Sequence, residues 1–242
     1  MNAKVISVWG ANGSGKTTTA VNLAFSLAQR NFTVGLISSN MYYGEMQTLC
    51  GCNIPEDRGI YHALMGGETK NMFVQAGKTS VFVLSVPDKF DAMQLTTVSA
   101  KSVKDMLDDA AFRFDYLVID GDTELNNPIS SIGMTEADMI IAVHRPSVKD
   151  CLWYSGMKGV GDLLNLSYKT VHILNTHDKS CDLSAYKSSI GLTFDFELGY
   201  VENANIYANT GQAIIFHDLR QEREYISGMK ALTSSVILGG GQ

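Results

Sequence analysis

Residues 4–19, KVISVWGANGSGKTTT, constrain this chain more than any other stretch. Residues 5–9 have the composition of a buried strand, and the residues after Lys16 have helical spacing. Between them, Gly10, Gly15, Lys16 and Thr17 fit the pattern G-x-x-x-x-G-K-[ST]. A chance match in a glycine-rich turn is the alternative, but strand, turn and helix in this order form the context in which the pattern binds phosphate. The sequence therefore predicts a nucleotide site at this turn.

Each residue type in the turn has a chemical role. Gly13 and Gly15 lack a Cβ, so backbone amide hydrogens can point inward at an anion. A helix that begins near Lys16 adds unpaired amides and the positive end of its dipole. Lys16 supplies a cation for the outer phosphates, and the Thr17 hydroxyl can bind Mg2+.

Length and composition restrict the class of protein. The chain has 242 residues, which suits a single nucleotide-binding domain over residues 1–242. A formal net charge of -6 argues against a surface built for nucleic acid. The four cysteines form no C-x-x-C pair, and no apolar run approaches the roughly 20 residues of a membrane helix. Because the first predicted strand begins at residue 5, we expect no cleaved signal peptide before it. We expect a cytoplasmic protein.

Strand and helix patterns alternate along the chain. Apolar runs predict strands at residues 5–9, 33–38, 80–86, 115–120, 139–143, 170–174 and 194–201. Helical spacing follows Lys16 and recurs at residues 60–65, 96–110, 148–166 and 220–236. Strands that read as apolar on both faces are typical of parallel sheets. The pattern predicts an α/β fold with one doubly wound, mostly parallel sheet, helices on both faces and ligand at the carboxyl edge.

Two later residues narrow the kind of nucleotide site. Asp120 ends a hydrophobic strand and can hold a water of the Mg2+ shell, the Walker B role; a helix-capping Asp is the alternative. GTPases of this type carry Asn-Lys-x-Asp after a later strand, whereas this chain has Asn175-Thr-His-Asp. The missing Lys favours adenine over guanine.

The order of these motifs resembles the ParA/MinD ATPases, which belong to the P-loop proteins that form nucleotide-sandwich dimers. The resemblance covers nearly the whole chain and rests on the segments GSGKTTTAVNLAFSLAQRNFTVGLIS, FDYLVIDGD, EADMIIAVHRPSVKD and ELGYVENANIYANTGQAII. Residues 81–120 are most similar to the TadZ/CpaE branch, which serves pilus assembly, and similar relatives occur in plasmid partition and conjugation.

The resemblance implies ATP and Mg2+ as cofactors and a homodimer formed on ATP binding. Lys16, Thr17 and Thr18 would hold phosphates and Mg2+, and Asp120 would be the Walker B acid. Asn175 and the backbone around residues 201–205 would bind adenine. The implied nucleotide-binding residues are Gly10, Asn12, Gly13, Ser14, Gly15, Lys16, Thr17, Thr18, Asn175, Val201 and Asn203, with Thr17 and Asp120 at the metal.

Two departures from the family pattern concern hydrolysis. The family's loop carries a first Lys that reaches the partner's phosphates, and here Ala11 takes that position. The family's second strand ends in D-x-D, whereas this chain has Ser38 and Asn40, which bind water but cannot act as a base at neutral pH. Asp122 or Glu124 could take over part of that task; solvated loop acids are the alternative. We therefore expect binding and only slow catalysis, with Lys16, Asp120, Asn40 and Asp122 as the catalytic candidates.

The kind of partner that the protein binds through its surface can be inferred by excluding nucleic acid and membrane in turn. Arg220, Arg223 and Lys230 share their helix with Glu222 and Glu224, so a solvated face is favoured over a nucleic-acid surface. The closing segment YISGMKALTSSVIL has one Lys and no bulky aromatic stripe, which does not support membrane binding. An unidentified protein partner is left. The hypotheses are a slow or conditional ATPase switch that positions an assembly, a scaffold that binds ATP without turnover, and a small-molecule kinase or GTPase.

Overall fold

An eight-stranded sheet runs through the protein in the order β3-β4-β2-β5-β1-β6-β7-β8. The computed structural model describes residues 2–176, 181–217 and 220–239. All neighbouring strands pair in parallel except β3 and β4, which are antiparallel. The strands are β1 (Lys4–Gly10), β2 (Val34–Ser38), β3 (Val74–Gln75), β4 (Val81–Leu84), β5 (Tyr116–Asp120), β6 (Met139–His144), β7 (Thr170–Asn175) and β8 (Phe196–Leu198). The predicted doubly wound, mostly parallel sheet is confirmed.

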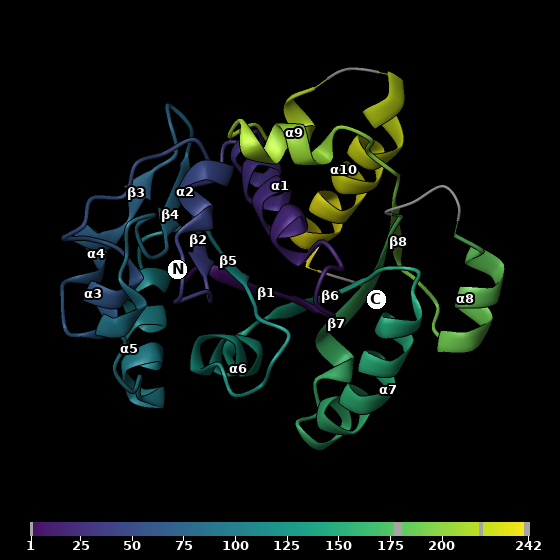
Figure 1. Cartoon of the computed structure of the whole chain (residues 1–242), viewed down its shortest axis with the longest axis horizontal. Coiled ribbons are helices and arrows are strands. Elements are labelled where there is room, and N and C mark those ends of the chain that lie inside the picture. Colours follow the sequence, from purple (N-terminus) through teal and green to yellow (C-terminus); the bar gives the residue numbers. More distant parts are fainter. Residues whose placement is uncertain (1, 177–180, 218–219, 240–242) are drawn as a thin grey trace.

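Helices cover both faces of this sheet (Figure 1). One face carries α1 and α10, which contact each other, and the other carries α5, α6 and α7. The α-helices are α1 (Lys16–Ala28), α2 (Glu45–Leu49), α3 (Ile60–Leu64), α4 (Thr69–Met72), α5 (Ala100–Ala111), α6 (Pro128–Glu136), α7 (Val148–Leu163), α8 (Leu183–Ile190), α9 (Ala204–Asn209) and α10 (Arg223–Leu238). Four 3-10 turns are described as well: η1 (Ala92–Gln94), η2 (Ser167–Lys169), η3 (Ile214–Phe216) and η4 (Arg220–Glu222).

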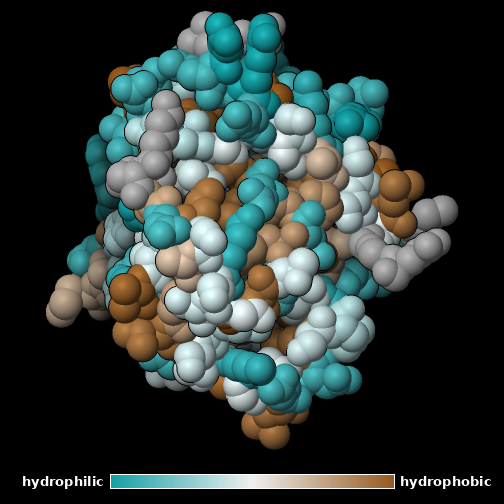
Figure 2. Space-filling model, turned by 90° about the vertical axis from the view of Figure 1, so that its right-hand side faces the viewer, coloured by the Kyte–Doolittle hydropathy of each residue, from teal (hydrophilic) through white to brown (hydrophobic). Residues whose placement is uncertain are grey.

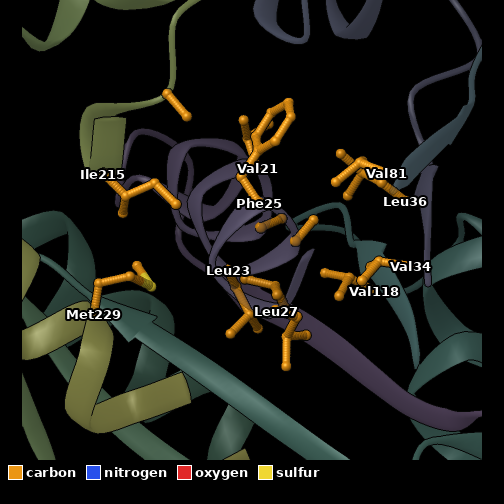
Figure 3. Packing of buried hydrophobic residues seen from close by; sticks show 14 of the residues in the cluster. Val21, Leu23, Phe25, Leu27, Val34, Leu36, Val81, Val118, Ile215 and Met229 are labelled. Carbon is orange, nitrogen blue, oxygen red and sulfur yellow. The ribbon is translucent and has the colours of Figure 1, made fainter. Parts of the chain in front are cut away.

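Helix α1 is buried over most of its surface, and this fixes the loop that precedes it. Leu23 and Leu27 lie against the sheet, while Phe25 makes an edge contact with Phe216 at a centroid distance of 5.3 Å. Figure 3 shows Leu23 and Leu27 of α1 between the sheet strands and Met229 of α10. Since nine residues of the helix are buried, its amino end is held firmly at the carboxyl edge of the sheet.

The predicted elements match the structure except at their ends and in short pieces. The helix predicted for 96–110 begins at Ala100, because the Ser99 side chain accepts from Ser102 N and caps it. The helix predicted for 148–166 ends at Leu163, and Asn165 follows with a positive φ of 50°. Helix α6 has an Asn-Pro start, a capping signal that the strand and helix patterns alone did not reveal. Strand β3 has two residues and no periodicity to detect.

The strand register brings the chemistry-bearing residues to one edge. Val8 and Ser38 both lie opposite Asp120, on either side of β5. Gly10 lies opposite Val143 at the end of β6, and Asn175 ends β7. Since parallel strands end at a common edge, the loop, the Walker B candidate and Asn175 meet there.

Candidate nucleotide-binding site

The phosphate loop depends on glycine at two points. A Cβ at Gly10 would come 2.3 Å from the carbonyl oxygen of Val143, so the loop can leave β1 against β6 only without a side chain. Gly15 has a φ of 96° and caps α1 in the left-handed conformation, which costs least for glycine. The loop therefore presents the first amides of α1 to its interior, as an anion site requires.

Lys16 begins α1 and is held over the loop. Its Nζ donates to the carbonyl oxygen of Ala11 at 3.1 Å and to Thr123 Oγ1 at 2.9 Å. Thr123 in turn donates to the carbonyl oxygen of Gly10 at 3.2 Å. Burial lowers the pKa of Lys16, and the carboxylate of Asp120 opposes that shift. The ammonium is thus positioned at the loop and has two hydrogen bonds that a phosphate oxygen can replace.

Thr17 and Asp120 form the metal end of the site. Thr17 donates its hydroxyl to Asp120 Oδ2 at 2.9 Å. Asp120 is buried, and its Oδ1 has no hydrogen-bond partner among the described residues. Burial raises the pKa of this carboxyl to about 7, although the bond from Thr17 and the charge of Lys16 lower it. A buried carboxylate oxygen without a partner, beside a threonine hydroxyl, fits Mg2+ and its water shell.

No cluster of three His, Cys, Asp or Glu able to hold a metal ion exists in the described part of the chain.

A cavity of about 300 Å³ opens from the loop toward β7 and β8. Asn175 stands at its wall and donates from Nδ2 to the carbonyl oxygen of Ser14 at 2.8 Å, which ties the base end to the loop. Tyr225 of α10 also lines it, and the buried Tyr225 hydroxyl has no partner among the described residues. The wall consists of Asn12, Gly13, Gly15, Lys16, Thr17, Thr18, Tyr43, Glu45, Asn175, Thr176, Gly199, Tyr200, Val201, Ala204, Asn205, Ala208, Ile214 and Tyr225.

Six of the candidate residues do not line this wall: Gly10, Ser14, Asn40, Asp120, Asp122 and Asn203. Asn203 precedes α9, where its carbonyl oxygen accepts from Ile206 N and Tyr207 N, and Asn205 faces the cavity in its place. Asn40 donates to Glu45 Oε1 at 3.3 Å behind the wall. Asp122 lines a neighbouring cleft of about 410 Å³. His177 and Asp178, which complete the Asn-x-x-Asp stretch, lie outside the described residues.

Tyr43 and Glu45 are among the wall residues that were not sequence candidates. Glu45 supplies the one acidic side chain on the described wall, and Tyr43 lies two residues before it. Both follow β2 by only a few residues, at the carboxyl edge where ligands bind. This position was their only signal, because a lone Glu and a lone Tyr in a loop match no motif.

Comparison with known proteins agrees with this geometry. A family model described as an AAA domain matches residues 3–178. The septum site-determining protein MinD of Neisseria meningitidis serogroup B is 25% identical over 149 residues, which are 60% of this chain and 55% of that protein. The match therefore spans about half the length of that relative.

Two solved structures share the fold. Pyrococcus horikoshii MinD, complexed with Mg-ADP, superposes with a TM-score of 0.79 at 16% identity, covering 97% of this chain and 96% of that one. A ParA family ATPase from Chlorobium tepidum has a TM-score of 0.75 at 18% identity, covering 98% of this chain and 100% of that one. Because the family model covers most of the chain and the fold agrees with it, the chain belongs to this AAA domain family and has the fold of the ParA/MinD-like P-loop ATPases.

Proposed function

We propose that this protein binds ATP with Mg2+ in the cytoplasm and acts as a slow or conditional ATPase. Its ATP-bound form is a homodimer that positions or assembles a partner complex, of the pilus or secretion, partition or conjugation type. One observation carries the proposal: a single cavity joins the phosphate loop at Lys16 and Thr17 to the base wall at Asn175 and Val201. Its volume of about 300 Å³ is that of a small-ligand pocket.

Different residues along this cavity bind the phosphates, the metal ion and the base. The loop amides and Lys16 hold phosphate oxygens, and the bond from Asn175 to Ser14 keeps the base wall in place relative to the loop. Thr17 and Asp120 hold Mg2+, which neutralises phosphate charge when bound. The Asn175 amide group already donates to Ser14, which leaves its Oδ1 as an acceptor. An acceptor can take a hydrogen bond from the exocyclic amine of a purine, and the missing Lys after Asn175 supports adenine over guanine.

Hydrolysis depends on which carboxylate can reach the attacking water. Ser38 is buried and accepts from Asn40 N at 3.2 Å, so the end of β2 contributes no base. Asp122 accepts from Thr123 N at 2.6 Å and lies in the neighbouring cleft. Glu45 lies on the cavity wall, and this supports a slow turnover that uses a carboxylate from outside the family's usual position.

A scaffold that binds ATP without turnover is the second candidate. It is favoured by the neutral side chains of Ser38 and Asn40 at the end of β2. Steady-state phosphate release separates the two functions. Release by the wild-type chain above that of Asp120→Ala supports the ATPase, and release equal to that background supports the scaffold. A kinase or GTPase is the third possibility, which competition of ATP against GTP tests: GTP binding as tight as ATP would favour it.

A protein partner is supported by the surface of α7. Val148, Leu152 and Leu163 are 77%, 69% and 83% exposed along this helix. On the side of the molecule where α7 and α8 lie, apolar side chains form separate patches among polar ones (Figure 2). None of the described helices combines the length and the apolar content needed to span a bilayer.

Nucleotide binding itself is tested by thermal melting. Saturating ATP with Mg2+ should raise the Tm of the wild-type chain by several degrees, since a ligand at about 100 times its Kd stabilises the folded state by about 2.7 kcal/mol. Lys16→Ala should weaken ATP binding by about 10- to 100-fold, the value of one hydrogen bond to a charged group. Lys101→Ala, an exposed lysine paired with Asp105, is the matched control. If saturating ATP with Mg2+ leaves the Tm of the wild-type chain unchanged, the proposal is contradicted.

A further inference from the structure

A second group of cations lies beside the phosphate loop. Because Gly10 pairs with Val143, residues just beyond β6 run alongside the loop residues just beyond β1. Arg145 is the second residue after Val143, and its Nη1 donates to the carbonyl oxygen of Gly13 at 3.4 Å. Guanidinium groups have five N–H donors, and this is the one hydrogen bond that Arg145 makes within the described ranges.

Lys149 adds a second charge at the same place. It lies in the first turn of α7 and is exposed. It is the fourth residue after Arg145 and the second residue of α7, so it follows closely the segment that contacts Gly13. No carboxylate in residues 2–176, 181–217 or 220–239 lies within 4.0 Å of the charged nitrogens of Arg145 or Lys149. Two cations without a counter-ion thus stand near a third.

We propose that Arg145 and Lys149 form a cationic pair at the mouth of the loop and make the site prefer a nucleoside triphosphate over a diphosphate. This inference rests on the proposed function and assigns its phosphate selectivity to two residues outside the loop motif. Mutual repulsion among Lys16, Arg145 and Lys149 is relieved by an anion, and more so by an anion of higher charge. Lys16 is the loop's one charged residue, because its second residue is the buried Ala11.

The pair acts within one chain. Arg145 contacts the loop of its own chain, and Lys149 follows Arg145 by four residues in the same chain. The selectivity is therefore present in the monomer, before any association. Cations on α7 that lie farther from the loop do not contribute to this selectivity. Lys158, for example, lies nine residues beyond Lys149, about 13 Å along the helix axis.

Binding of ATP and of ADP, each with Mg2+, tests the pair by calorimetry at a protein concentration where sedimentation shows monomer. Arg145→Ala should weaken ATP binding by about tenfold and ADP binding by less than about twofold, since a charge-assisted contact is lost only for the longer phosphate chain. Lys149→Ala should shift the ATP to ADP preference in the same direction by about threefold, as an exposed charge does. Arg145→Lys, which keeps the charge, should recover most of the preference.

The controls are Lys158→Ala on α7 and Arg58→Ala, an exposed arginine in the loop before α3; neither should change the preference. Melting without nucleotide shows that each variant is folded. Equal weakening of ATP and ADP by Arg145→Ala, or no weakening, overturns the inference while leaving ATP binding by the wild type intact. A wild-type chain that binds neither nucleotide overturns the proposed function and this inference with it.

Discussion

At the scale of single residues, the metal end of the site depends on the hydrogen bond between Thr17 and Asp120. Thr17 holds one oxygen of Asp120, and burial leaves the other without a partner in the described chain. A carboxyl with a pKa raised to about 7 is poorly solvated in its charged form, so a bound cation stabilises it more than it would a surface acid. The burial that destabilises the charged carboxylate of Asp120 therefore favours the binding of a metal ion to it.

Glu45 is the residue whose removal best tests turnover. Glu45→Gln keeps the shape and the contact with Asn40 but removes the base, so steady-state phosphate release should fall by about 10- to 100-fold. ATP affinity should stay within about twofold, because the loop is untouched. Asp122→Asn, from the neighbouring cleft, is the comparison and should leave the rate nearly unchanged. If Asp122→Asn lowers the rate of phosphate release more than Glu45→Gln does, Asp122 and not Glu45 acts as the base.

At the scale of elements, close packing decides where glycine is required. Gly228 of α10 lies against β8, where a Cβ would come 2.2 Å from the carbonyl oxygen of Glu197. Gly156 of α7 has no atom within 4 Å of its Cβ position. The neighbouring backbone of β8 therefore requires glycine at position 228, whereas nothing around position 156 requires it.

The two glycines form a matched pair of substitutions. Gly228→Ala should lower the free energy of unfolding by about 1–3 kcal/mol, because α10 must move away from β8. Gly156→Ala should raise it by about 0.5–1 kcal/mol through helix propensity alone. Urea denaturation midpoints at constant slope measure both. Changes of the same sign in the two variants would show that backbone freedom, and not packing, determines the cost.

A buried polar network joins β6, β7, α7 and α8. His144 contacts Asp150 at 2.9 Å and His172 at 3.0 Å, and Tyr186 donates to Asp150 at 2.6 Å. Burial lowers the pKa of His172 to about 4, helped by His144 and opposed by Asp195. His172 is therefore neutral in the folded protein at neutral pH.

This network predicts a pH dependence of stability. Because the pKa of folded His172 lies below the value of 6.5 for free imidazole, the unfolded chain takes up the proton first as the pH falls. Stability should therefore decline between about pH 6.5 and 4, by up to about 3 kcal/mol from this residue. His172→Gln should flatten that part of the curve, measured by urea unfolding across the range. An unchanged slope would show that His172 titrates normally.

At the scale of the whole molecule, one edge of the sheet gathers both the nucleotide cavity and exposed aromatic rings. Tyr42 and Tyr43 are 67% and 59% exposed beside the cavity wall. Exposed aromatic side chains at a functional edge are typical of surfaces that bind another protein. A second copy of the chain fits this edge if ATP bridges the two.

Association is the corresponding prediction. Sedimentation velocity should show a dimer with ATP and Mg2+ and a monomer with ADP, because the bridging phosphate is lost. Lys16→Ala should stay monomeric with either nucleotide. A wild-type chain that is monomeric under saturating ATP would contradict the dimeric switch but would leave ATP binding untouched.

Local patterns were enough to predict much of this protein. The loop from Gly10 to Thr17, its strand and its helix depend on adjacent residues, so their chemistry could be inferred without coordinates. Asp120 was recognisable because an acid ended a wholly apolar strand. The alternation of strands and helices likewise predicted the parallel sheet, since each element carries its own periodicity.

The positions of residues without a motif depended on the tertiary structure alone. Glu45 reaches the cavity wall, and Asp122 the cleft beside it, because of how two loops leave neighbouring strands. Arg145 reaches Gly13 because β6 pairs with β1, although more than a hundred residues separate them. The sequence by itself determined the phosphate loop, because its glycines, Lys16 and Thr17 stand at fixed spacings in one short segment. Only the tertiary structure decided which distant charges surround it, because strand order and register bring those residues together.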